Sequence, residues 1–321
     1  MKSDVVVGID LGGTKIAAAI FSSTGNILHK EVVLFGNKTG HDVGKLIHKQ
    51  IQNCFLTSKS RRLNICAIGV SVPGISNQKT EKVWAPNIPG WKNYPLRAEI
   101  ISTLKDKRIS VTIESDRSCY ILGETWQGAA KNCANAIFLA VGTGIGAGIL
   151  VDGKILPGAN DIAGAIGWMA LQKPFRAEYI SCGCFEHHAS GEGLVKVAKE
   201  LIAADKKYPG GLKNKKFTAF DIFKVHDAGD PIAKMVLEQA IEFWGMAAAN
   251  LVSLFNPEKI IFGGGIFGPA TKFLPSIFAE AKKWAQPISI QQVKFEPSKL
   301  GGDAGLYGAA YLALRTLRKH S

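Results

Sequence analysis

Residues 5–15, with the sequence VVVGIDLGGTK, decide the fold class of this 321-residue chain. The apolar, β-branched run that ends at Asp10 predicts a strand, the glycines after it predict a turn, and the apolar run over 15–21 predicts a second strand. Another glycine turn precedes a third apolar run over 27–33. The chain is therefore expected to begin with an antiparallel meander of three strands.

The same order of strand, glycine turn and strand returns around Gly142–Gly146. Apolar runs and amphipathic patterns elsewhere predict alternating strands and helices. Strands are expected over 65–72, 111–115 and 259–262, and helices over 40–58, 191–201, 230–255 and 306–317. The sequence therefore predicts two duplicated α/β halves with a ligand cleft between them. We expect a smaller N-terminal domain of residues 1–117 plus 305–321 and a larger one of residues 118–304.

The composition is that of an ordinary globular protein, with 46% hydrophobic and 20% charged residues. It excludes disorder over most of the chain, and 35 glycines without a Gly-X-Y period exclude collagen. The net charge of +13 attracts anions, but the basic residues are scattered and not interleaved with aromatic ones, so no nucleic-acid partner is expected. Since no signal peptide or membrane span is visible, we expect a cytoplasmic protein with reduced thiols and no membrane partner.

The first glycine turn has the residue types of a phosphate site. The backbone N–H groups of Gly12 and Gly13 can point into one concavity, and Thr14 and Lys15 add a hydroxyl donor and a cation. Asp10, at the end of the preceding strand, could hold Mg²⁺ directly or through water. A Walker A loop is excluded because its GxxxxGK[ST] spacing is absent and a strand follows. A plain β-turn is the alternative.

Two further glycine turns complete the candidate nucleotide contacts. Gly142, Thr143 and Gly144 repeat the first turn, and because no helix follows, a Rossmann dinucleotide site is excluded. Gly264 and Gly265 follow a buried strand, where glycine permits close approach of the backbone to a flat ring such as adenine. A tight turn between strand and helix explains these two glycines nearly as well. Two phosphate-type hairpins facing one cleft would suit a nucleoside triphosphate.

The order and spacing of motifs along the whole chain resemble the ROK family (repressors, open reading frames and kinases) of the sugar kinase, actin and heat-shock-70 superfamily. The matching segments are GIDLGGTK (8–15), GVSVPG (69–74), APNIPGW (85–91), ESD (114–116), GTGIG (142–146), CFE (184–186) and GGG (263–265). The resemblance implies two actin-like (ribonuclease H-like) α/β domains with an active-site cleft between them. It also implies a glucokinase-like hexose kinase that uses ATP and Mg²⁺, and it is compatible with a homodimer.

The resemblance also assigns roles outside the glycine turns. Asp116 falls on the position of the catalytic base, where a carboxylate can accept the proton of the sugar hydroxyl, usually O6, as it attacks the γ-phosphorus. Asn87 and Glu186 match sugar contacts, and Ser115 stands where the family usually has a sugar-binding Asn. A surface glutamate at a helix start is the alternative for Glu186.

The sugar side departs from the family pattern, whereas the phosphate side keeps it. The family's Glu-x-Gly-His becomes Ala165-Ile166-Gly167-Trp168, which removes a carboxylate near C1 and C2 of the sugar; Trp168 could stack on an apolar sugar face. Arg117 replaces a small residue after the candidate base. We therefore expect altered sugar recognition. The alternatives to a glucokinase are an N-acetylmannosamine, N-acetylglucosamine or other modified-hexose kinase, a fructokinase or an allose kinase.

Structural zinc, which the family often carries, is not expected here. Only Cys184 survives of the family's cysteine ligands, with Ala177 and Tyr179 at two other ligand positions, and Zn²⁺ commonly takes at least three protein ligands. The alternative is a rearranged site of Cys182, Cys184, His187 and His188. Without such a site, both histidines are expected to be ordinary helix-flank residues.

A regulator is the second class of function that the resemblance allows. Family repressors carry a winged helix before the first glycine motif, and Asp10 lies too near the start of this sequence for one, so a DNA-binding repressor is disfavoured. A non-catalytic sugar sensor is the other form of this alternative. The retention of Asp116 and Lys15 argues against it.

Overall fold

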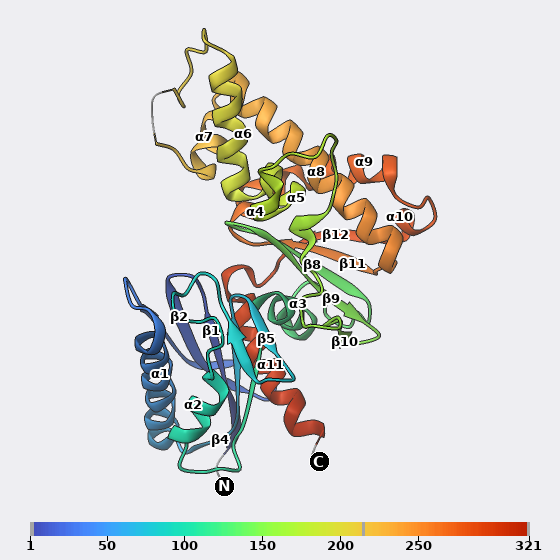
Figure 1. Cartoon of the computed structure of the whole chain (residues 1–321). Helices are drawn as coiled ribbons and strands as arrows, with labels where there is room; N and C mark the ends of the chain where they lie inside the picture. The colour runs from blue at the N-terminus through green and yellow to red at the C-terminus, as the bar shows by residue number, and fades with distance from the viewer. Residues whose placement is uncertain (1–2, 214–215, 320–321) are drawn as a thin grey trace. The chain divides into compact units, whose positions relative to one another are not determined.

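The computed structural model describes residues 3–213 and 216–319, which form two compact units (Figure 1). Unit 1 consists of Met1–Asn132, Leu156–Ala163 and Gly302–Ser321, and unit 2 of Cys133–Ile155 and Gly164–Gly301. The outermost residues of the expected N-terminal domain, 1–2 and 320–321, lie outside the described residues. Among the helices of the described chain, none has the length and apolar character needed to cross a membrane.

Unit 1 is built on a five-stranded sheet in the order β3-β2-β1-β4-β7. Its strands are β1 (Ser3–Leu11), β2 (Lys15–Ser22), β3 (Ile27–Leu34), β4 (Leu63–Val72) and β7 (Ser110–Ser115). The first three are antiparallel neighbours, which confirms the predicted meander, and β4 and β7 extend the sheet with parallel pairing. A separate antiparallel pair is formed by β5 (Ile75–Asn77) and β6 (Lys82–Trp84).

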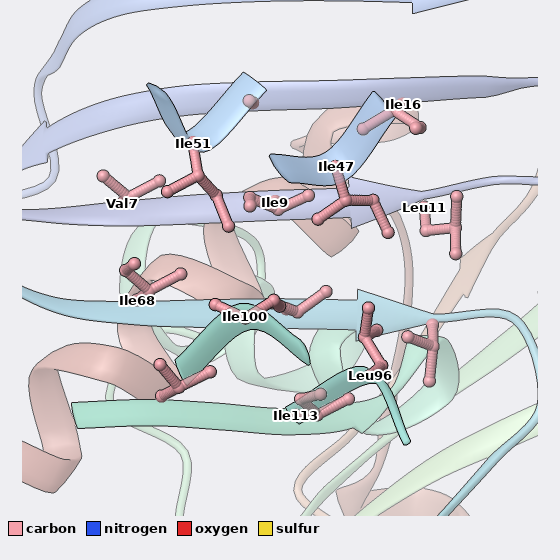
Figure 2. Close-up of a cluster of buried hydrophobic side chains, with 14 of the residues drawn as sticks. Val7, Ile9, Leu11, Ile16, Ile47, Ile51, Ile68, Leu96, Ile100 and Ile113 are labelled. Carbon is pink, nitrogen blue, oxygen red and sulfur yellow. The ribbon is translucent and has the colours of Figure 1, made fainter. Parts of the chain in front are cut away.

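Helices cover both faces of this sheet, because alternate residues of a strand point to opposite faces. On one face, α1 (Gly40–Ser60) and α2 (Leu96–Thr103) bury Ile47 and Ile100 against strand residues such as Ile9 (Figure 2). On the other face, α11 (Ala304–Lys319) packs against β1 and β4 with α3 (Asp116–Gln127) beside it. The sheet is therefore buried on both sides, as expected for an α/β unit.

Glycines allow α11 to lie very close to the sheet and to α3. A Cβ at Gly69 in β4 would lie 1.9 Å from Ala309 O, and a Cβ at Gly308 would lie 1.8 Å from Cys119 O. Any larger residue at either position would push the two backbones apart. Because α3 is packed onto α11 in this way, unit 1 continues through α3 to Asn132, beyond the boundary expected after residue 117.

Unit 2 repeats the topology of unit 1, with a sheet in the order β10-β9-β8-β11-β12. Its strands are β8 (Ala136–Val141), β9 (Ile145–Val151), β10 (Lys154–Ile155), β11 (Lys259–Gly263) and β12 (Lys294–Pro297). Again three antiparallel strands come first and two parallel strands extend them. The α/β class and the duplication predicted from the two glycine hairpins are both confirmed.

The helices of unit 2 include the long predicted helix, which is confirmed as α8 (Pro231–Phe255). It begins where Asp230 accepts a hydrogen bond from Ala233 N–H at 3.0 Å, and it ends before Asn256, which has a left-handed backbone. The other helices are α4 (Tyr179–Cys182), α5 (Cys184–Ala189), α6 (Gly191–Ala204), α7 (Ala219–Asp227), α9 (Leu274–Trp284) and α10 (Ser289–Gln292). Short 3₁₀ turns of this unit are η1 (Ile166–Trp168), η2 (Gly265–Phe267) and η3 (Pro269–Phe273), and a further one, η4 (Gly301–Asp303), leads back into unit 1.

Candidate active site

Ser115 ends strand β7 and caps helix α3, so that Asp116 becomes the first residue of the helix. The Ser115 hydroxyl oxygen accepts a hydrogen bond from Ser118 N–H at 3.4 Å and donates one to Ser118 Oγ at 3.0 Å. The Ser115 side chain is buried. Its hydroxyl, expected to contact a sugar, therefore caps the helix and fixes the point at which Asp116 leaves the strand.

The Asp116 carboxylate is held by two donors of its own helix. Oδ1 accepts from Arg117 N–H at 2.8 Å, and Oδ2 accepts from the Tyr120 hydroxyl at 3.3 Å. Burial raises the pKa of Asp116, while the Arg117 charge and the Tyr120 hydrogen bond oppose that rise. Tyr120 is not predicted from any sequence motif. Its position four residues after the candidate base, on the same helix face, is the signal that could have found it.

Asp10 lies at the end of β1, in the same sheet as the strand that precedes Asp116. The pKa of Asp10 is raised to about 6, mainly by burial and in smaller part by the Asp116 carboxylate, while Ser71 and Lys15 oppose the rise. The first turn of α11 packs directly on this group, since a Cβ at Gly305 would lie 2.5 Å from Asp10 Oδ1. Unit 1 thus gathers two of the predicted residues, Asp10 and Asp116, into one acidic site at the carboxyl ends of its strands.

The first glycine turn is the tip of the β1–β2 hairpin. Gly12 N–H donates to Lys15 O at 2.9 Å, which closes the turn. Gly13, Thr14 and Lys15 are exposed. The backbone of Gly13 and both side chains are therefore available to a ligand, as a phosphate-binding turn requires.

Asn87 is exposed on a loop that is anchored by its neighbours. Ile88 and Trp91 are buried, and Trp91 Nε1 donates to Gly40 O at 3.0 Å while its ring stacks on Tyr94 at 4.3 Å. The loop thus has a rigid apolar base and presents the Asn87 amide to solvent, which fits the predicted role in binding a polar ligand.

In unit 2, the second glycine hairpin is tied to Glu186 on α5. Glu186 Oε2 accepts a hydrogen bond from Ile145 N–H at 2.6 Å, and a Cβ at Gly144 would lie 2.6 Å from the same oxygen. Glu186 is half-buried, and burial raises its pKa. It is therefore not a plain surface glutamate: one carboxylate oxygen holds the hairpin, and the predicted sugar contact would use the other.

Trp168 ends η1 and has an exposed fraction of 56%. The preceding residue, Gly167, lies against Glu186, since a Cβ there would be 3.0 Å from Glu186 Oε2. Gly183, with a left-handed backbone, packs on the Trp168 Cα. Unit 2 therefore brings the predicted residues Gly144, Trp168 and Glu186 into one neighbourhood, with the indole ring open to a ligand.

A pocket of about 740 Å³ opens beside the same hairpin. It is lined by Gly142 and Thr143 from the hairpin and by Gly265 after β11, so three predicted nucleotide contacts meet there. Gly264, with a left-handed backbone, lies behind it against the Val141 carbonyl group. The remaining lining residues come from α6, η2 and the segment before and at the start of α7: Gly191, Glu192, Val195, Lys196, Lys199, Phe217, Thr218, Ala219, Phe220 and Ile266.

The two lysines of this pocket are not predicted from any sequence motif. Lys196 and Lys199 are three residues apart on α6, a spacing that places both on one face of a helix. Lys196 also lies close enough to Glu186 to oppose the rise of its pKa. The pocket therefore combines apolar walls with two cations and a glycine turn.

One expectation about the histidines is wrong. His187 and His188 were expected at a helix flank, but both are buried, each with an exposed fraction of 3%. His188 contacts Tyr179 and Gln239, and His187 lies 3.5 Å from Glu200. Over residues 3–213 and 216–319, no group of three or more His, Cys, Asp or Glu side chains is arranged to hold a metal ion.

Comparison with known proteins identifies relatives along nearly the whole chain. The ROK family model matches residues 6–316. A glucokinase of Halalkalibacterium halodurans is 32% identical over 95% of this chain and 94% of its own length. A xylose repressor of Caldicellulosiruptor bescii is 29% identical over 96% of this chain and 78% of its own length.

Solved structures agree with the sequence relatives. A ROK family glucokinase from Streptomyces griseus, crystallised in complex with glucose and AMPPNP, superimposes with a TM-score of 0.76 at 28% identity, over 97% of this chain and 99% of that one. The expected fold class of two actin-like α/β domains is confirmed by this likeness.

Proposed function

The chain belongs to the ROK family, and on that basis we propose that it is an ATP-dependent hexose kinase that transfers the γ-phosphate to a sugar hydroxyl, at O6. The observation that carries this proposal is the acidic site of unit 1. It contains a half-buried carboxylate, Asp116, at the start of a helix, with a second carboxylate, Asp10, at the end of a strand of the same sheet.

Asp116 acts as the general base in this proposal. Arg117 N–H and the Tyr120 hydroxyl orient the carboxylate and stabilise its ionised form. It accepts the proton of the sugar hydroxyl while that oxygen bonds to the γ-phosphorus and the bond from phosphorus to the β–γ bridging oxygen breaks. Ser115 contributes by capping α3 and thereby fixing the direction of this carboxylate.

Asp10 fits a role at a magnesium ion that arrives with the nucleotide. Mg²⁺ typically uses one or two protein carboxylates, waters and phosphate oxygens, and Asp10 is a desolvated carboxylate whose pKa of about 6 reflects burial beside a second acid. When bound, the ion would neutralise charge on the phosphate oxygens. Asp10 would hold it directly or through water, and Lys15 would add a positive charge at the same end of the sheet.

The nucleotide binds in the pocket of unit 2 in this proposal. Thr143 of the second glycine turn lines this pocket, and Lys196 and Lys199 offer positive charge for the phosphates. Phe217, Phe220 and Ile266 offer apolar surface for a base, with Gly264 and Gly265 allowing close approach of the backbone. In unit 1, the exposed residues Gly13, Thr14 and Lys15 of the first glycine turn are the candidate phosphate contacts.

The sugar contacts favour a second candidate substrate. Asn87 and Glu186 can bind hydroxyl groups, but Ala165 offers no carboxylate and the Trp168 indole ring is 56% exposed. An apolar aromatic surface suits a substituent such as an N-acetyl group better than a bare hydroxyl. We therefore propose N-acetylmannosamine, N-acetylglucosamine or another modified hexose as the alternative to glucose.

A panel of hexoses with Mg-ATP tests both substrates. We expect ADP release with at least one hexose or acylamino hexose, and we expect Asp116→Asn to abolish it. Selective turnover of unmodified glucose would reject altered sugar recognition. No turnover of any sugar by the wild type, with Asp116→Asn indistinguishable from it, would reject the kinase and leave the sugar-sensing regulator, the class to which the related xylose repressor belongs by name.

The pocket is tested separately by the lysines. Lys199→Ala should raise the nucleotide KM, because Lys199 lines the pocket. The sugar KM should stay nearly unchanged, because the lysine whose charge acts on the candidate sugar contact Glu186 is Lys196 and not Lys199. Lys234→Ala, on the exposed face of α8, is the matched control. Equal effects of the two substitutions would reject a nucleotide site in this pocket.

A further inference from the structure

The ROK resemblance implies a zinc centre near Cys184, and the side chains present there do not fit one. Tyr179 stands at one family ligand position, and its hydroxyl shares a hydrogen bond of 2.7 Å with His188 Nε2. The other ring nitrogen of His188 lies 3.3 Å from Gln239 Nε2. Both nitrogens of His188 therefore have protein partners, and a zinc ion would have too few free ligands among the described residues.

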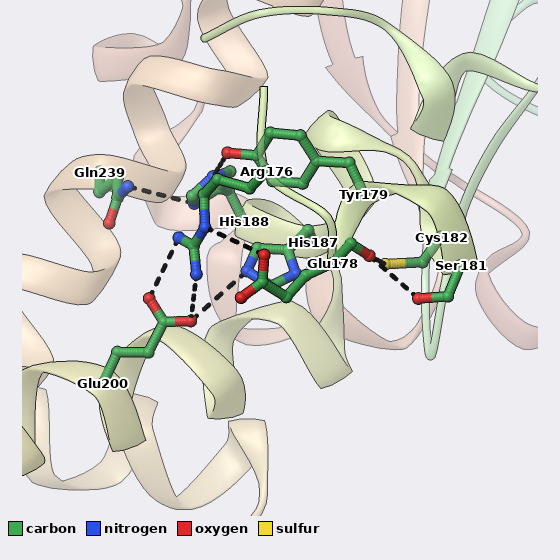
Figure 3. A network of polar contacts seen from close by, with 9 residues as sticks. All are labelled: Arg176, Glu178, Tyr179, Ser181, Cys182, His187, His188, Glu200 and Gln239. Carbon is green, nitrogen blue, oxygen red and sulfur yellow. Dashed lines mark hydrogen bonds and ion pairs between the residues drawn. The ribbon is translucent and has the colours of Figure 1, made fainter. Parts of the chain in front are cut away.

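A different set of contacts holds residues 176–189 in place (Figure 3). Arg176 makes a two-pronged ion pair with Glu200 on α6, with N···O distances of 2.8 and 3.2 Å. The Arg176 guanidinium group also lies over the Tyr179 ring, 5.8 Å from its centroid. Such paired geometry is the strong form of the arginine–carboxylate interaction. It ties the start of the segment to α6.

The second anchor joins His188 of α5 to residues of α8. The His188 ring stacks on Phe243 with centroids 4.5 Å apart, and its nitrogens contact Tyr179 and Gln239. Burial lowers the pKa of His188 to about 4, so the ring is neutral at pH 7 and can serve one partner as donor and the other as acceptor. We call Arg176, Tyr179, His188, Glu200 and Gln239 the polar brace.

The polar brace includes His188, which lies on the same short helix, α5, as the residue that holds the glycine hairpin. Glu186 lies on α5 between Cys184 and the two buried histidines, and its carboxylate accepts the hydrogen bond from Ile145 N–H. A short helix such as α5 has little stability of its own. The direction of Glu186 therefore depends on the contacts that fix α4 and α5 to α6 and α8.

We propose that the polar brace replaces the family's metal centre, so that residues 176–189 are held without zinc and Tyr179, Arg176 and Glu200 act as positioning residues for Glu186. The kinetic consequence rests on the proposed kinase function. The structural consequence does not, because the order of residues 176–189 can be measured in the absence of any substrate.

Metal analysis and hydrogen exchange test the structural part on the full-length wild type. We expect far less than one zinc per chain, and we expect neither the melting temperature nor the amide protection of residues 184–189 to change with 1,10-phenanthroline. Tyr179→Phe should speed exchange of these amides roughly tenfold, as expected from the loss of one buried hydrogen bond. Stoichiometric zinc whose removal unfolds the segment would overturn the proposal, as would unchanged protection in Tyr179→Phe.

Charge reversal tests the ion pair and its link to catalysis. Arg176→Glu and Glu200→Arg should each speed exchange in residues 184–189 and raise the sugar KM several-fold with little change in the nucleotide KM. The double variant should restore both, which a purely local loss of packing would not do. Glu81→Arg is the control, because Glu81 forms an ion pair with Arg97 in unit 1, in which both carboxylate oxygens lie 2.9 Å from Arg97 Nη1.

The outcomes separate the two proposals. If hydrogen exchange in residues 184–189 changes as expected but no sugar is phosphorylated, the kinase proposal is rejected and the polar brace is retained. If turnover is robust and Glu81→Arg has the same effect on residues 184–189 as Glu200→Arg, the polar brace is rejected and the kinase proposal is retained. Failure of the double variant to restore protection would also overturn the brace.

Discussion

Gly144→Ala isolates the contact between the second glycine hairpin and Glu186. Gly144 has no left-handed backbone, so alanine can adopt its conformation. The new Cβ would lie 2.6 Å from Glu186 Oε2 and 3.0 Å from Cδ. No backbone atom is among its three nearest neighbours, so the carboxylate is the group that must move.

The size of the effect follows from these distances. Ordinary contact begins at 3.4 Å, so the carboxylate must retreat by about 0.8 Å. The hydrogen bond from Ile145 N–H, now 2.6 Å long, would then exceed the useful range for a charged acceptor. Losing such a bond costs about 1.5–3 kcal/mol. If Glu186 binds the sugar, kcat/KM for the sugar should fall by about 10- to 150-fold.

Steady-state kinetics with both substrates measures this effect. The sugar KM should rise while the nucleotide KM changes little, because Gly142 and Thr143, and not Gly144, line the pocket. The same substitution in a Glu186→Ala background should cost less than about twofold, since the group that the Cβ displaces is gone. Gly302→Ala is the control, because a Cβ there meets nothing within 4 Å.

Two results would refute this reasoning. Wild-type kinetics in Gly144→Ala would mean that the Glu186 contact does not support the site. An equal loss in both backgrounds would mean that the alanine acts on something other than the carboxylate. A thermal melt of each variant separates either result from loss of folding.

Three further predictions concern unit 1. Asp116→Asn should lower kcat by roughly 10²- to 10⁴-fold with a nearly unchanged melting temperature, because it removes a general base. A kcat equal to that of the wild type would contradict this. Tyr120→Phe should shift the acid limb of the pH–kcat profile to higher pH: the lost hydrogen bond stabilised the ionised carboxylate, so the pKa of Asp116 rises and the base is protonated earlier as pH falls. An unmoved limb would exclude Tyr120 as a positioning residue. Gly69→Ala should lower stability by about 1–3 kcal/mol or more in denaturant titration, since its Cβ would lie 1.9 Å from Ala309 O; wild-type stability would mean that α11 can shift freely.

The meander and the duplication could be predicted because their signals are local. Apolar runs around a glycine turn, at residues 5–21 and again near Gly142–Gly146, determine hairpins whatever follows them in the chain. The limit of unit 1 could not be predicted in this way. It depends on contact between Gly308 and Cys119, which are far apart in sequence and approach only because glycine has no side chain.

The candidate site shows the same division. Asp116 and Glu186 are predicted because they lie in short motifs, whereas Tyr120, Lys196 and Lys199 can be recognised as candidates only from the helix face on which they lie. The histidines of α5 were placed at a helix flank because six residues give too little periodicity to predict burial, and the stacking of His188 on Phe243 depends on a distant helix.

The two units share a topology but offer opposite chemistry. Unit 1 has two carboxylates at its strand ends, which suit a cation and a proton acceptor, and the pocket of unit 2 has two lysines and apolar walls, which suit a nucleotide. Phosphoryl transfer needs both kinds of site, because charge on the phosphate must be neutralised while the attacking hydroxyl loses its proton. If the proposed function is right, neither half of the duplication can catalyse the reaction alone. A substitution in the acidic site should then lower kcat, and one in the pocket should raise the nucleotide KM.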